Sequence, residues 1–438
     1  MKRFLRIVGA LLIVALIGGC IYLNSLMPII TGYAAKNLAS AVFVSGRDAK
    51  DVEALDLNFS FIRYNKNTVD YEHKTVTSRF LWGKSTAVYR EGYGVTLLRG
   101  ANADELKQQV YPLPVENKPS RPLPMGDSAT WLRLDPIAKA FVDQRTYKGH
   151  PFAFVVLHNG GVVAERYDKG ITSETKLLSW SMAKSFTNAL AGVMVRDGLV
   201  DIYAPMDIPE WQNDDRKNIT VNDLMQMQSG LKWNEDYGSR SDVNLMLFRE
   251  QDMGHYALSK PLEHEPGTYW YYSSGSTNIV MRYLRGKFPN DQAFLAYITT
   301  KLFVPMGICD AVFEPDMSGT PIGSSYLYTT PMDFARFGQL YLDGGCADSL
   351  RILPEGWVNY TTAPASNSEN GYGSFFWLNR GKELPDVPED MYYCNGHDGQ
   401  RIFIIPSEDL VVAILSYSPK PDHVIDFNAL LRDIISRL

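Results

Sequence analysis

Periodic apolar positions indicate a mixed α/β domain in the last two-thirds of the chain. Residues 134–147 carry apolar side chains at helical spacing, and apolar runs at 152–157 and 162–167 flank a His-Asn-Gly-Gly turn, which predicts a β-hairpin. A helix is expected from residue 181 to about 195, and a helix- and loop-rich middle at about 201–320. The pattern then predicts strands at 374–378, 401–405 and 410–415 and a closing helix at 427–438. The sheet therefore takes strands from both ends of a domain spanning 126–438.

Residues 28–125 form an N-terminal extension with a weaker pattern. A helix is expected at 33–41 and strands at 57–63, 75–81 and 86–98. A Pro-rich stretch at 117–124 predicts a linker, so we place the domain boundary after residue 125. No catalytic chemistry is indicated in this extension.

The first 27 residues predict a signal or membrane anchor. Basic residues at positions 2, 3 and 6 precede an uncharged apolar run at 7–23, which is close to the shortest length that crosses a bilayer. Ile17-Gly18-Gly19-Cys20 resembles a lipobox and makes Cys20 a lipidation candidate, although the apolar run continues beyond it. An uncleaved anchor, a lipoprotein and a cleaved signal stay open. All three place the remainder across a bacterial inner membrane, facing the periplasm.

Composition excludes several classes of partner. The 438 residues carry a formal charge of −6, and no basic cluster stands out beyond the first few residues, so nucleic acid is not an expected partner. Gly-rich nucleotide loops, His-Glu-x-x-His and paired Cys-x-x-Cys motifs are absent, so neither a cofactor nor a metal is expected. The three remaining cysteines have no metal-ligand spacing, and free thiols are favoured over a disulfide among Cys309, Cys346 and Cys394.

The tetrapeptide Ser181-Met182-Ala183-Lys184 is the central candidate for catalysis. Residues i and i+3 share one helix face, so a serine in the first turn projects together with Lys184. A lysine whose pKa is lowered by burial can act as the base, and a helix N-terminus favours negative charge at the serine. Ser-x-x-Lys is common by chance, and a second match begins at Ser173 in a turn-like stretch. Only Ser181 follows an apolar hairpin and opens an apolar-periodic helix.

Two further elements follow in order along the chain. A Pro-Gly turn at 266–267 precedes Tyr272 and Ser274, and a Gly-rich segment, Cys394-Asn395-Gly396-His397-Asp398-Gly399-Gln400, leads into the strand at 401–405. With Ser181 and Lys184, these elements resemble the serine β-lactamase and penicillin-binding superfamily. The sequence around Tyr272 is similar to that of the branch of 6-aminohexanoate-dimer hydrolases and related esterases. The resemblance covers roughly residues 130–438.

The resemblance implies a β-lactamase/transpeptidase-like fold, an antiparallel sheet flanked by helices with a helical subdomain. Tyr272 would pass protons between the nucleophile, Lys184 and the leaving group. The backbone N–H of Ser181 would form the oxyanion hole with a second N–H, for which two registers fit. In one register His397-Asp398-Gly399 is the family triad and the Gln400 N–H donates. In the other, Cys394-Asn395-Gly396 is the triad and the His397 N–H donates. The sequence pattern of the amide-hydrolase branch favours the second register. Substrate contacts are expected at Tyr237, Ser274, Asn395, Gly396 and Gly399.

We therefore expect a serine hydrolase that cleaves a small amide or ester through an acyl-enzyme on Ser181. Ser274 stands where the family has Asn, and the last triad has no Lys, so two groups that β-lactam-binding members use are missing. A linear amide or ester is favoured over a β-lactam, and both over a D-Ala-D-Ala carboxypeptidase substrate. A non-catalytic, membrane-tethered binding protein of the same fold is the alternative of another class, and the set of Ser181, Lys184 and Tyr272 argues against it. The absence of Gly-x-Ser-x-Gly disfavours an α/β-hydrolase.

Overall fold

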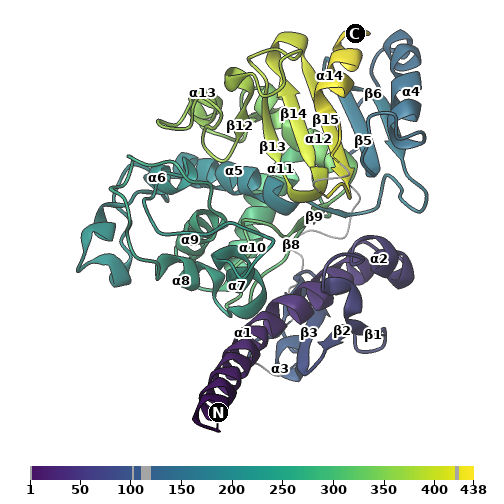
Figure 1. The fold of residues 1–438 in the computed structure, drawn as a ribbon. Coiled ribbons are helices and arrows are strands. Elements are labelled where there is room, and N and C mark those ends of the chain that lie inside the picture. Colours follow the sequence, from purple (N-terminus) through teal and green to yellow (C-terminus); the bar gives the residue numbers. More distant parts are fainter. Residues whose placement is uncertain (1, 101–102, 110–119, 420–423) are drawn as a thin grey trace.

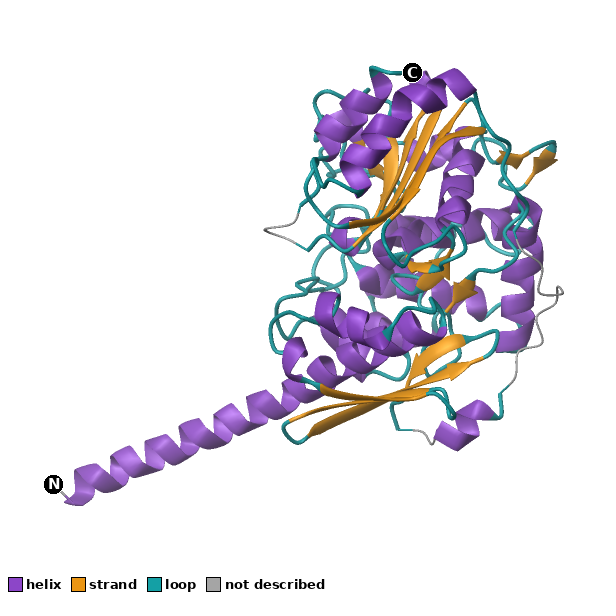
Figure 2. Cartoon of the chain, turned by 90° about the vertical axis from the view of Figure 1, so that its right-hand side faces the viewer, coloured by secondary structure: helices purple, strands orange, loops and turns teal. Residues whose placement is uncertain are grey.

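A six-stranded antiparallel sheet with the order β12-β13-β14-β15-β5-β6 is the framework of the C-terminal part of the chain (Figures 1 and 2). The computed structural model describes residues 2–100, 103–109, 120–419 and 424–438. β5 pairs with β15 along its whole length, so strands from opposite ends of the domain are neighbours, as expected from the sequence. The strands are β5 (Pro151–His158), β6 (Gly161–Tyr167), β12 (Trp377–Leu378), β13 (Tyr392–Asn395), β14 (Arg401–Ile405) and β15 (Leu410–Ser416).

Helices cover both faces of this sheet because its strands are apolar on both sides. Along β14, Ile402 and Ile404 belong to the core shared with α5 and α12, whereas Phe403 and Ile405 face the core shared with α4 and α14. The predicted antiparallel sheet flanked by helices is thereby confirmed. The covering helices are α4 (Ser128–Val142), α5 (Ala183–Arg196), α12 (Pro331–Leu342) and α14 (Phe427–Ile435).

Short helices and small sheets make up the middle of the domain, and α7 to α10 lie below α5 in the view of Figure 1. One small sheet has three strands in the order β7-β9-β8, and its strand β7 directly precedes the turn before α5 in sequence. The helices are α6 (Val221–Met225), α7 (Asp242–Arg249), α8 (Met253–Leu258), α9 (Ser274–Arg285), α10 (Asp291–Ile298) and α11 (Val304–Met306), with α13 (Trp357–Thr362) further on. The short strands are β7 (Leu177–Leu178), β8 (Val312–Phe313), β9 (Leu327–Thr329), β10 (Cys346–Ala347) and β11 (Leu350–Arg351).

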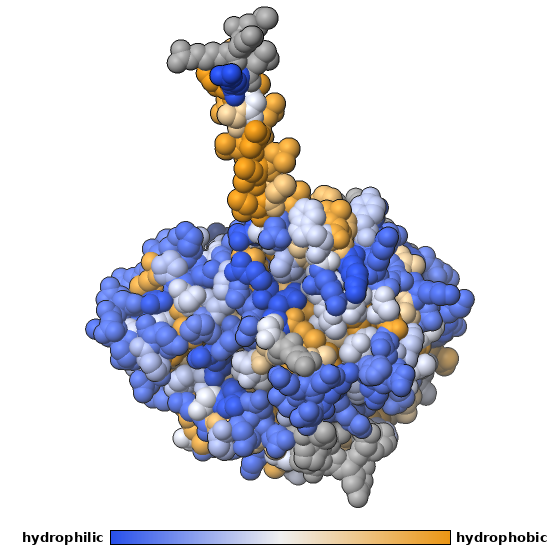
Figure 3. Space-filling model, turned by 90° about the horizontal axis from the view of Figure 1, so that it is seen from below, coloured by the Kyte–Doolittle hydropathy of each residue, from blue (hydrophilic) through white to orange (hydrophobic). Residues whose placement is uncertain are grey.

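The N-terminal extension is built on one long helix. The first half of α1 projects from the body as an apolar rod, and its second half, from about Met27 to Val42, is buried against the meander β1-β2-β3-β4 (Figures 1 and 3). Among the described residues α1 is the one helix long and apolar enough to cross a membrane, a test that signal sequences also pass. The elements are α1 (Lys2–Phe43), α2 (Ala49–Leu55), β1 (Lys66–Asp70), β2 (Thr75–Phe80), β3 (Gly83–Arg90), β4 (Gly94–Leu97) and α3 (Ala103–Lys107).

Several local predictions were wrong. The strand expected at 57–63 is absent, because Asp48 caps α2 and the chain continues into a helical turn at Ile62–Tyr64. The strand expected at 86–98 is a hairpin, in which Gly92 and Gly94 take positive φ between β3 and β4. The strand expected at 374–378 is reduced to β12, because Phe375 takes a φ of 55°, and β13 was not predicted.

The boundaries at residues 27 and 125 stay predictions. The helix expected at 33–41 is part of α1, which runs through residue 27 without a break. Part of the Pro-rich segment 117–124 lies outside the described residues. The remainder lies along the body, where the Arg121 N–H donates to the Gly307 carbonyl.

A buried ion pair joins the extension to the rest of the chain. Lys36 of α1 donates to the carboxylate of Glu314 and to the Val95 carbonyl, and both charged side chains are at most 2% exposed. The hydroxyl of Ser40 donates to the two carboxylate oxygens of Glu314 at 3.0 and 2.9 Å. Around this pair, side chains of the extension and of the sheet domain form one continuous apolar core. The extension is therefore part of the same folded body.

We expect Glu314→Ala to lower the free energy of unfolding by about 3–5 kcal/mol, because it leaves the Lys36 ammonium buried without its partner. Asp348→Ala is the matched control. It removes the partner of Arg121 in a pair whose side chains are more than half exposed, and should change stability by less than about 1 kcal/mol. Urea denaturation in detergent followed by circular dichroism measures both. Small and equal changes in the free energy of unfolding of the two variants would contradict a charged, buried ion pair between Lys36 and Glu314.

Candidate active site

Ser181 lies at the entrance of α5, in a helical turn formed by Trp180–Met182. The preceding residue, Trp180, has a φ of 45°, a left-handed conformation that a non-glycine side chain rarely adopts. Such strain persists only where the surroundings hold the residue. Here the buried indole packs against the rings of Tyr326 and His397, with centroids 5.8 and 5.4 Å away. The turn that presents Ser181 is thus set by packing on both sides.

Lys184 projects beside Ser181 from the first turn of α5, as the i, i+3 spacing predicts. Its amine donates to the Ser181 hydroxyl at 2.9 Å, the Ser274 hydroxyl at 3.0 Å and the Ser324 carbonyl at 3.1 Å. The side chain is 1% exposed. All three protons of the charged form therefore have acceptors inside the protein, and one acceptor is the candidate nucleophile.

The pKa of Lys184 falls to about 8, because burial disfavours its charged form more than nearby Glu235 favours it. At pH 7 about a tenth of such lysines are neutral. A neutral Lys184 can take the proton of Ser181 directly through the existing hydrogen bond. The pair thus has the geometry and proton affinity of a nucleophile and its base.

Tyr272 closes the site from the segment before α9. The Lys184 amine lies 4.9 Å from the centre of its ring, and its hydroxyl is in polar contact with the Ser181 side chain. Burial, followed by the charge of Glu235, raises the pKa of Tyr272 well above its ordinary value. The hydroxyl stays protonated at neutral pH and can donate a proton. The structure thus brings Ser181, Lys184 and Tyr272 together.

Glu235 completes this network, and the sequence analysis assigned it no role. Its carboxylate accepts the Ser274 N–H at 2.8 Å, at the N-terminus of α9, and also accepts the Ser274 hydroxyl and the Trp233 indole N–H. Burial raises the pKa of Glu235, and Lys184 opposes that rise. A side chain on Gly275 would lie 2.7 Å from the Trp233 ring, so this glycine lets the Glu235 loop pack on α9. A glutamate in an aromatic loop was the one signal that could have found it.

The Gly-rich segment meets the Ser181 turn at Gly396. A Cβ on Gly396 would lie 2.4 Å from the Ser179 carbonyl oxygen, so only glycine allows β13 to end this close to the nucleophile. The next residue, His397, has a backbone N–H without an acceptor among the described residues, and the same holds for the N–H of Ser181. An oxyanion hole needs two such free backbone donors, so Ser181 and His397 are candidates for this role.

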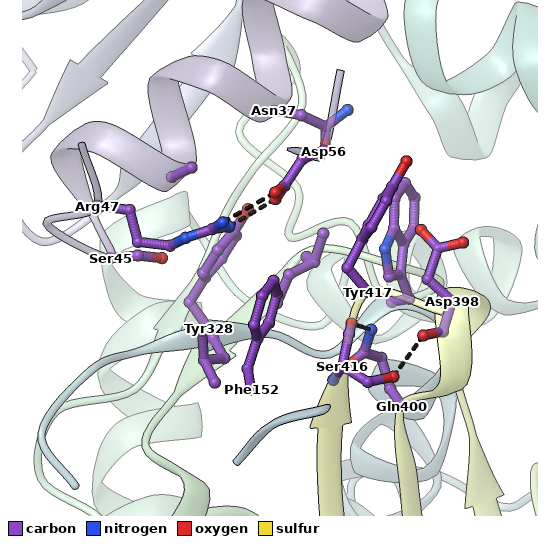
Figure 4. Close-up of a pocket in the computed structure, with 14 residues that line it drawn as sticks. Asn37, Ser45, Arg47, Asp56, Phe152, Tyr328, Asp398, Gln400, Ser416 and Tyr417 are labelled. Atoms are coloured by element: carbon purple, nitrogen blue, oxygen red, sulfur yellow. Dashed lines mark hydrogen bonds and ion pairs between the residues drawn. The ribbon is translucent and has the colours of Figure 1, made fainter. Parts of the chain in front are cut away.

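The other register places its groups elsewhere. Gln400 directs its side chain to the backbone of Ser416, and its N–H points back to the His397 carbonyl. A Cβ on Gly399 would meet the Ser416 hydroxyl at 2.5 Å. Gln400 and Asp398 line a separate pocket under the extension, opposite the Arg47–Asp56 ion pair (Figure 4). The Gln400 N–H and side chain are therefore engaged with other partners, whereas the His397 N–H has no acceptor among the described residues.

The remaining predicted contacts lie in two environments. The ring of Tyr237 stacks on His397 with centroids 5.0 Å apart, and its buried hydroxyl has no hydrogen bond of ordinary geometry among the described residues. Asn395, at the end of β13, is half-buried, and its amide is likewise free in the part of the chain that the structure describes. Ser274 is fully buried and faces Lys184 instead of open space. Cys20 lies on the exposed half of α1, far along the chain from this site.

Neither a disulfide nor a metal cluster is seen within residues 2–100, 103–109, 120–419 and 424–438. Cys394, which occupies the first triad position of the favoured register, is buried, and burial raises the pKa of its thiol to about 12. It therefore has no cationic or nucleophilic function at the site at neutral pH.

A family model described as Beta-lactamase matches residues 135–434. The chain belongs to the beta-lactamase family. This confirms the resemblance inferred from the three motifs and, with the observed sheet and helices, the predicted fold. The beta-lactamase-family match covers every residue of the Ser181 site, whereas the whole extension precedes it.

Relatives of this beta-lactamase-family protein include hydrolases. It is 26% identical over 343 residues to the 6-aminohexanoate-dimer hydrolase of Paenarthrobacter ureafaciens, an alignment that covers 69% of this chain and 82% of the relative. Among solved structures, a putative 6-aminohexanoate-dimer hydrolase from Bacillus anthracis matches at 22% identity and a TM-score of 0.55, over 67% of this chain and 79% of that chain. A family VIII carboxylesterase matches at 16% identity and a TM-score of 0.54, over 72% and 99%. The two structures support the fold alone.

The charge network predicts how the reactivity of Ser181 depends on pH. The neutral form of Lys184 is the reactive one, so the rate of serine modification should rise with pH through about 8 and level off above it. Glu235→Gln removes a charge that raises the pKa of Lys184, so the rising limb should move to lower pH. The measurement is the rate of labelling by a fluorophosphonate across pH.

Glu263→Gln is the control for this experiment, because Glu263 is a half-exposed carboxylate paired with Lys232 on the surface. The labelling rate of Glu263→Gln should depend on pH in the same way as that of the unaltered protein. A limb that moves to higher pH in Glu235→Gln, or stays in place, would show that Glu235 does not act on Lys184 through its charge.

Proposed function

We propose that this protein is a serine hydrolase that cleaves a small linear amide or ester through an acyl-enzyme on Ser181. The observation that carries the proposal is the 2.9 Å hydrogen bond between the Ser181 hydroxyl and a buried lysine with a pKa of about 8. A structural lysine would need neither the lowered proton affinity nor the serine at the head of a helix.

The proposed reaction has two halves. Lys184 takes the Ser181 proton while Ser181 Oγ attacks the carbonyl carbon, and the N–H groups of Ser181 and His397 receive the oxyanion. As the tetrahedral intermediate collapses, the bond to the amine or alcohol breaks, and Tyr272 gives that leaving group a proton and regains one from Lys184. A water molecule then attacks the ester on Ser181, and its proton passes through the same groups to Ser181 Oγ as the bond between Oγ and the carbonyl carbon breaks and the carboxylic acid leaves.

Two features support a linear amide or ester over a β-lactam. At position 274 a serine hydroxyl is held between Lys184 and Glu235, so no amide side chain is offered to the substrate there. The first position of the last triad is the buried thiol of Cys394, so this position offers no lysine ammonium to bind a substrate carboxylate. The similarity to a 6-aminohexanoate-dimer hydrolase and the fold of a carboxylesterase agree with this preference. Tyr237 and Asn395 are the proposed substrate contacts.

We also propose that α1 is an uncleaved anchor in the inner membrane, with the catalytic domain facing the periplasm. Its side chains from Ile7 to Leu23 are uncharged and mostly exposed, a surface that water does not favour. Basic residues at positions 2, 3 and 6 favour a cytoplasmic start. A lipid on Cys20 or a cleaved signal are the alternatives, which the mass of the purified chain distinguishes.

Substrate profiling tests the proposal. The full chain in detergent should hydrolyse p-nitrophenyl esters and a linear dimer of 6-aminohexanoate faster than nitrocefin or a D-Ala-D-Ala peptide. Faster cleavage of nitrocefin or of the peptide would overturn the substrate class. Absence of every hydrolysis would favour a binding protein of this fold.

Variants of the catalytic set test the mechanism. Ser181→Ala should abolish turnover, and Tyr272→Phe should lower kcat by about 10²- to 10⁴-fold, because it removes a proton-transfer group. Tyr271→Phe is the matched control, since its side chain is 39% exposed and is the direct neighbour of Tyr272. Steady-state kinetics with one ester measures all three. Retained activity in Ser181→Ala, or equal losses in the two tyrosine variants, would contradict the assignment.

A further inference from the structure

The protruding helix enters the body without a flexible linker. α1 is continuous from Lys2 to Phe43, and the part beyond Met27 is buried in the core. Arg6 and Asn24 are separated by about 27 Å along a helix that rises 1.5 Å per residue, close to the roughly 30 Å of a bilayer's hydrocarbon core. If α1 spans the membrane, as proposed above, the far interface lies near Asn24. Whatever surrounds α1 at that level then touches lipid headgroups.

The tip of the β2–β3 hairpin lies at this level. The Trp82 indole N–H donates to the Asn24 side chain at 3.0 Å, and a Cβ on Gly83 would meet Met27 at 2.8 Å. Leu81 and Trp82 nevertheless leave their side chains 67% and 57% exposed. Seen from the side on which α1 projects, apolar surface adjoins the helix where it enters the body (Figure 3). Exposed Trp beside an apolar span is typical of a membrane interface.

The turn itself is unusual for a water-exposed hairpin. Leu81 takes a φ of 49°, a conformation for which two-residue hairpin turns favour glycine or asparagine. A leucine at this position strains the backbone and places an apolar side chain in water. Both disadvantages are offset if the tip lies in lipid.

Three cations stand in a row directly behind this tip. Lys66 pairs with Arg79 across β1 and β2, and Arg79 pairs with Lys84 across β2 and β3. Directly opposed residues project from one face of a sheet, and like charges there repel. All three side chains are exposed, and none forms an ion pair with another described residue. A row of unpaired cations beside an apolar tip fits anionic headgroups.

A loop next to the proposed catalytic residues reaches the outer part of the span. A groove between α1 and the loop after Tyr237 is lined by Gly18, Ile21, Tyr22, Ser25, Ser239 and Arg240. Tyr237, at the start of that loop, stacks on His397. The loop that follows Tyr237 therefore lies beside the outer part of the span.

We infer that Leu81, Trp82, Lys66, Arg79 and Lys84 form a hairpin face that rests on an anionic phospholipid surface. This inference depends on the membrane anchor proposed above. α1 then holds the domain in the membrane, and the hairpin face fixes its orientation, with the loop that contains Ser239 and Arg240 next to the bilayer.

Quenching of tryptophan fluorescence by brominated lipids tests the hairpin face. The full chain is reconstituted in vesicles of phosphatidylcholine and phosphatidylglycerol that carry bromine near the headgroup end of the acyl chain. Trp82→Phe should remove at least half of the bromine-dependent quenching. Trp131→Phe, a change in α4, should leave that quenching as in the unaltered protein. Replacing phosphatidylglycerol by phosphatidylcholine should weaken the quenching of the unaltered protein and leave Trp82→Phe unchanged.

Flotation of the same vesicles separates the two ways of failing. Failure of the chain to float with vesicles would overturn the anchor and, with it, the hairpin face. Flotation with equal quenching in the unaltered protein and Trp82→Phe would overturn the hairpin face alone and leave the anchor in place. Quenching that is unaffected by phosphatidylglycerol would overturn the role of the three cations. Hydrolysis of a soluble ester in detergent should be unchanged in Trp82→Phe. The flotation and quenching results therefore do not depend on the proposed reaction.

Discussion

The site depends on one amine that is kept out of water within hydrogen-bond distance of a serine. Lys184 has three acceptors, and they come from separate parts of the chain: the turn before α5, the first residue of α9 and the loop before β9. Burial lowers its pKa to about 8, and Glu235 behind Ser274 limits that fall. Moving any of these segments would leave the Lys184 amine without one of its acceptors or expose it to water. Either change would alter the pKa of the amine.

Close packing of backbones keeps those segments in place. The Ser181 turn is held from one side by β9, where the Ser179 N–H donates to the Leu327 carbonyl at 2.8 Å, and from the other by β13, where Gly396 permits contact with the Ser179 carbonyl. The extension contributes too, because Tyr33 of α1 stacks on Trp180 beside the nucleophile, with ring centroids 6.3 Å apart. A helix that begins outside the body thus passes next to the candidate active site.

Local patterns predicted the parts of the site that depend on local geometry. Ser181 and Lys184 are three residues apart at the start of a helix, so their contact follows from helical spacing. Tyr272 and the Gly396–His397 segment were identified through the resemblance to the β-lactamase superfamily. Glu235 was missed because its contact with Ser274 joins residues 39 apart and depends on Trp233 packing over Gly275. The strand at 57–63 was wrong for a related reason: Phe59 packs on Tyr33 of α1, with ring centroids 5.4 Å apart, and the local pattern does not show this partner.

The central claim is that Ser181 carries the acyl group, and its most direct measurement is the mass of the enzyme during turnover. The full chain is mixed with a p-nitrophenyl ester, quenched in acid within the first turnovers, digested and analysed by mass spectrometry. The account predicts the acyl mass on the peptide that contains Ser181, and its absence in Ser181→Ala. An acyl group on another residue, such as Ser274, or hydrolysis with no acylated peptide at any quench time, would contradict it.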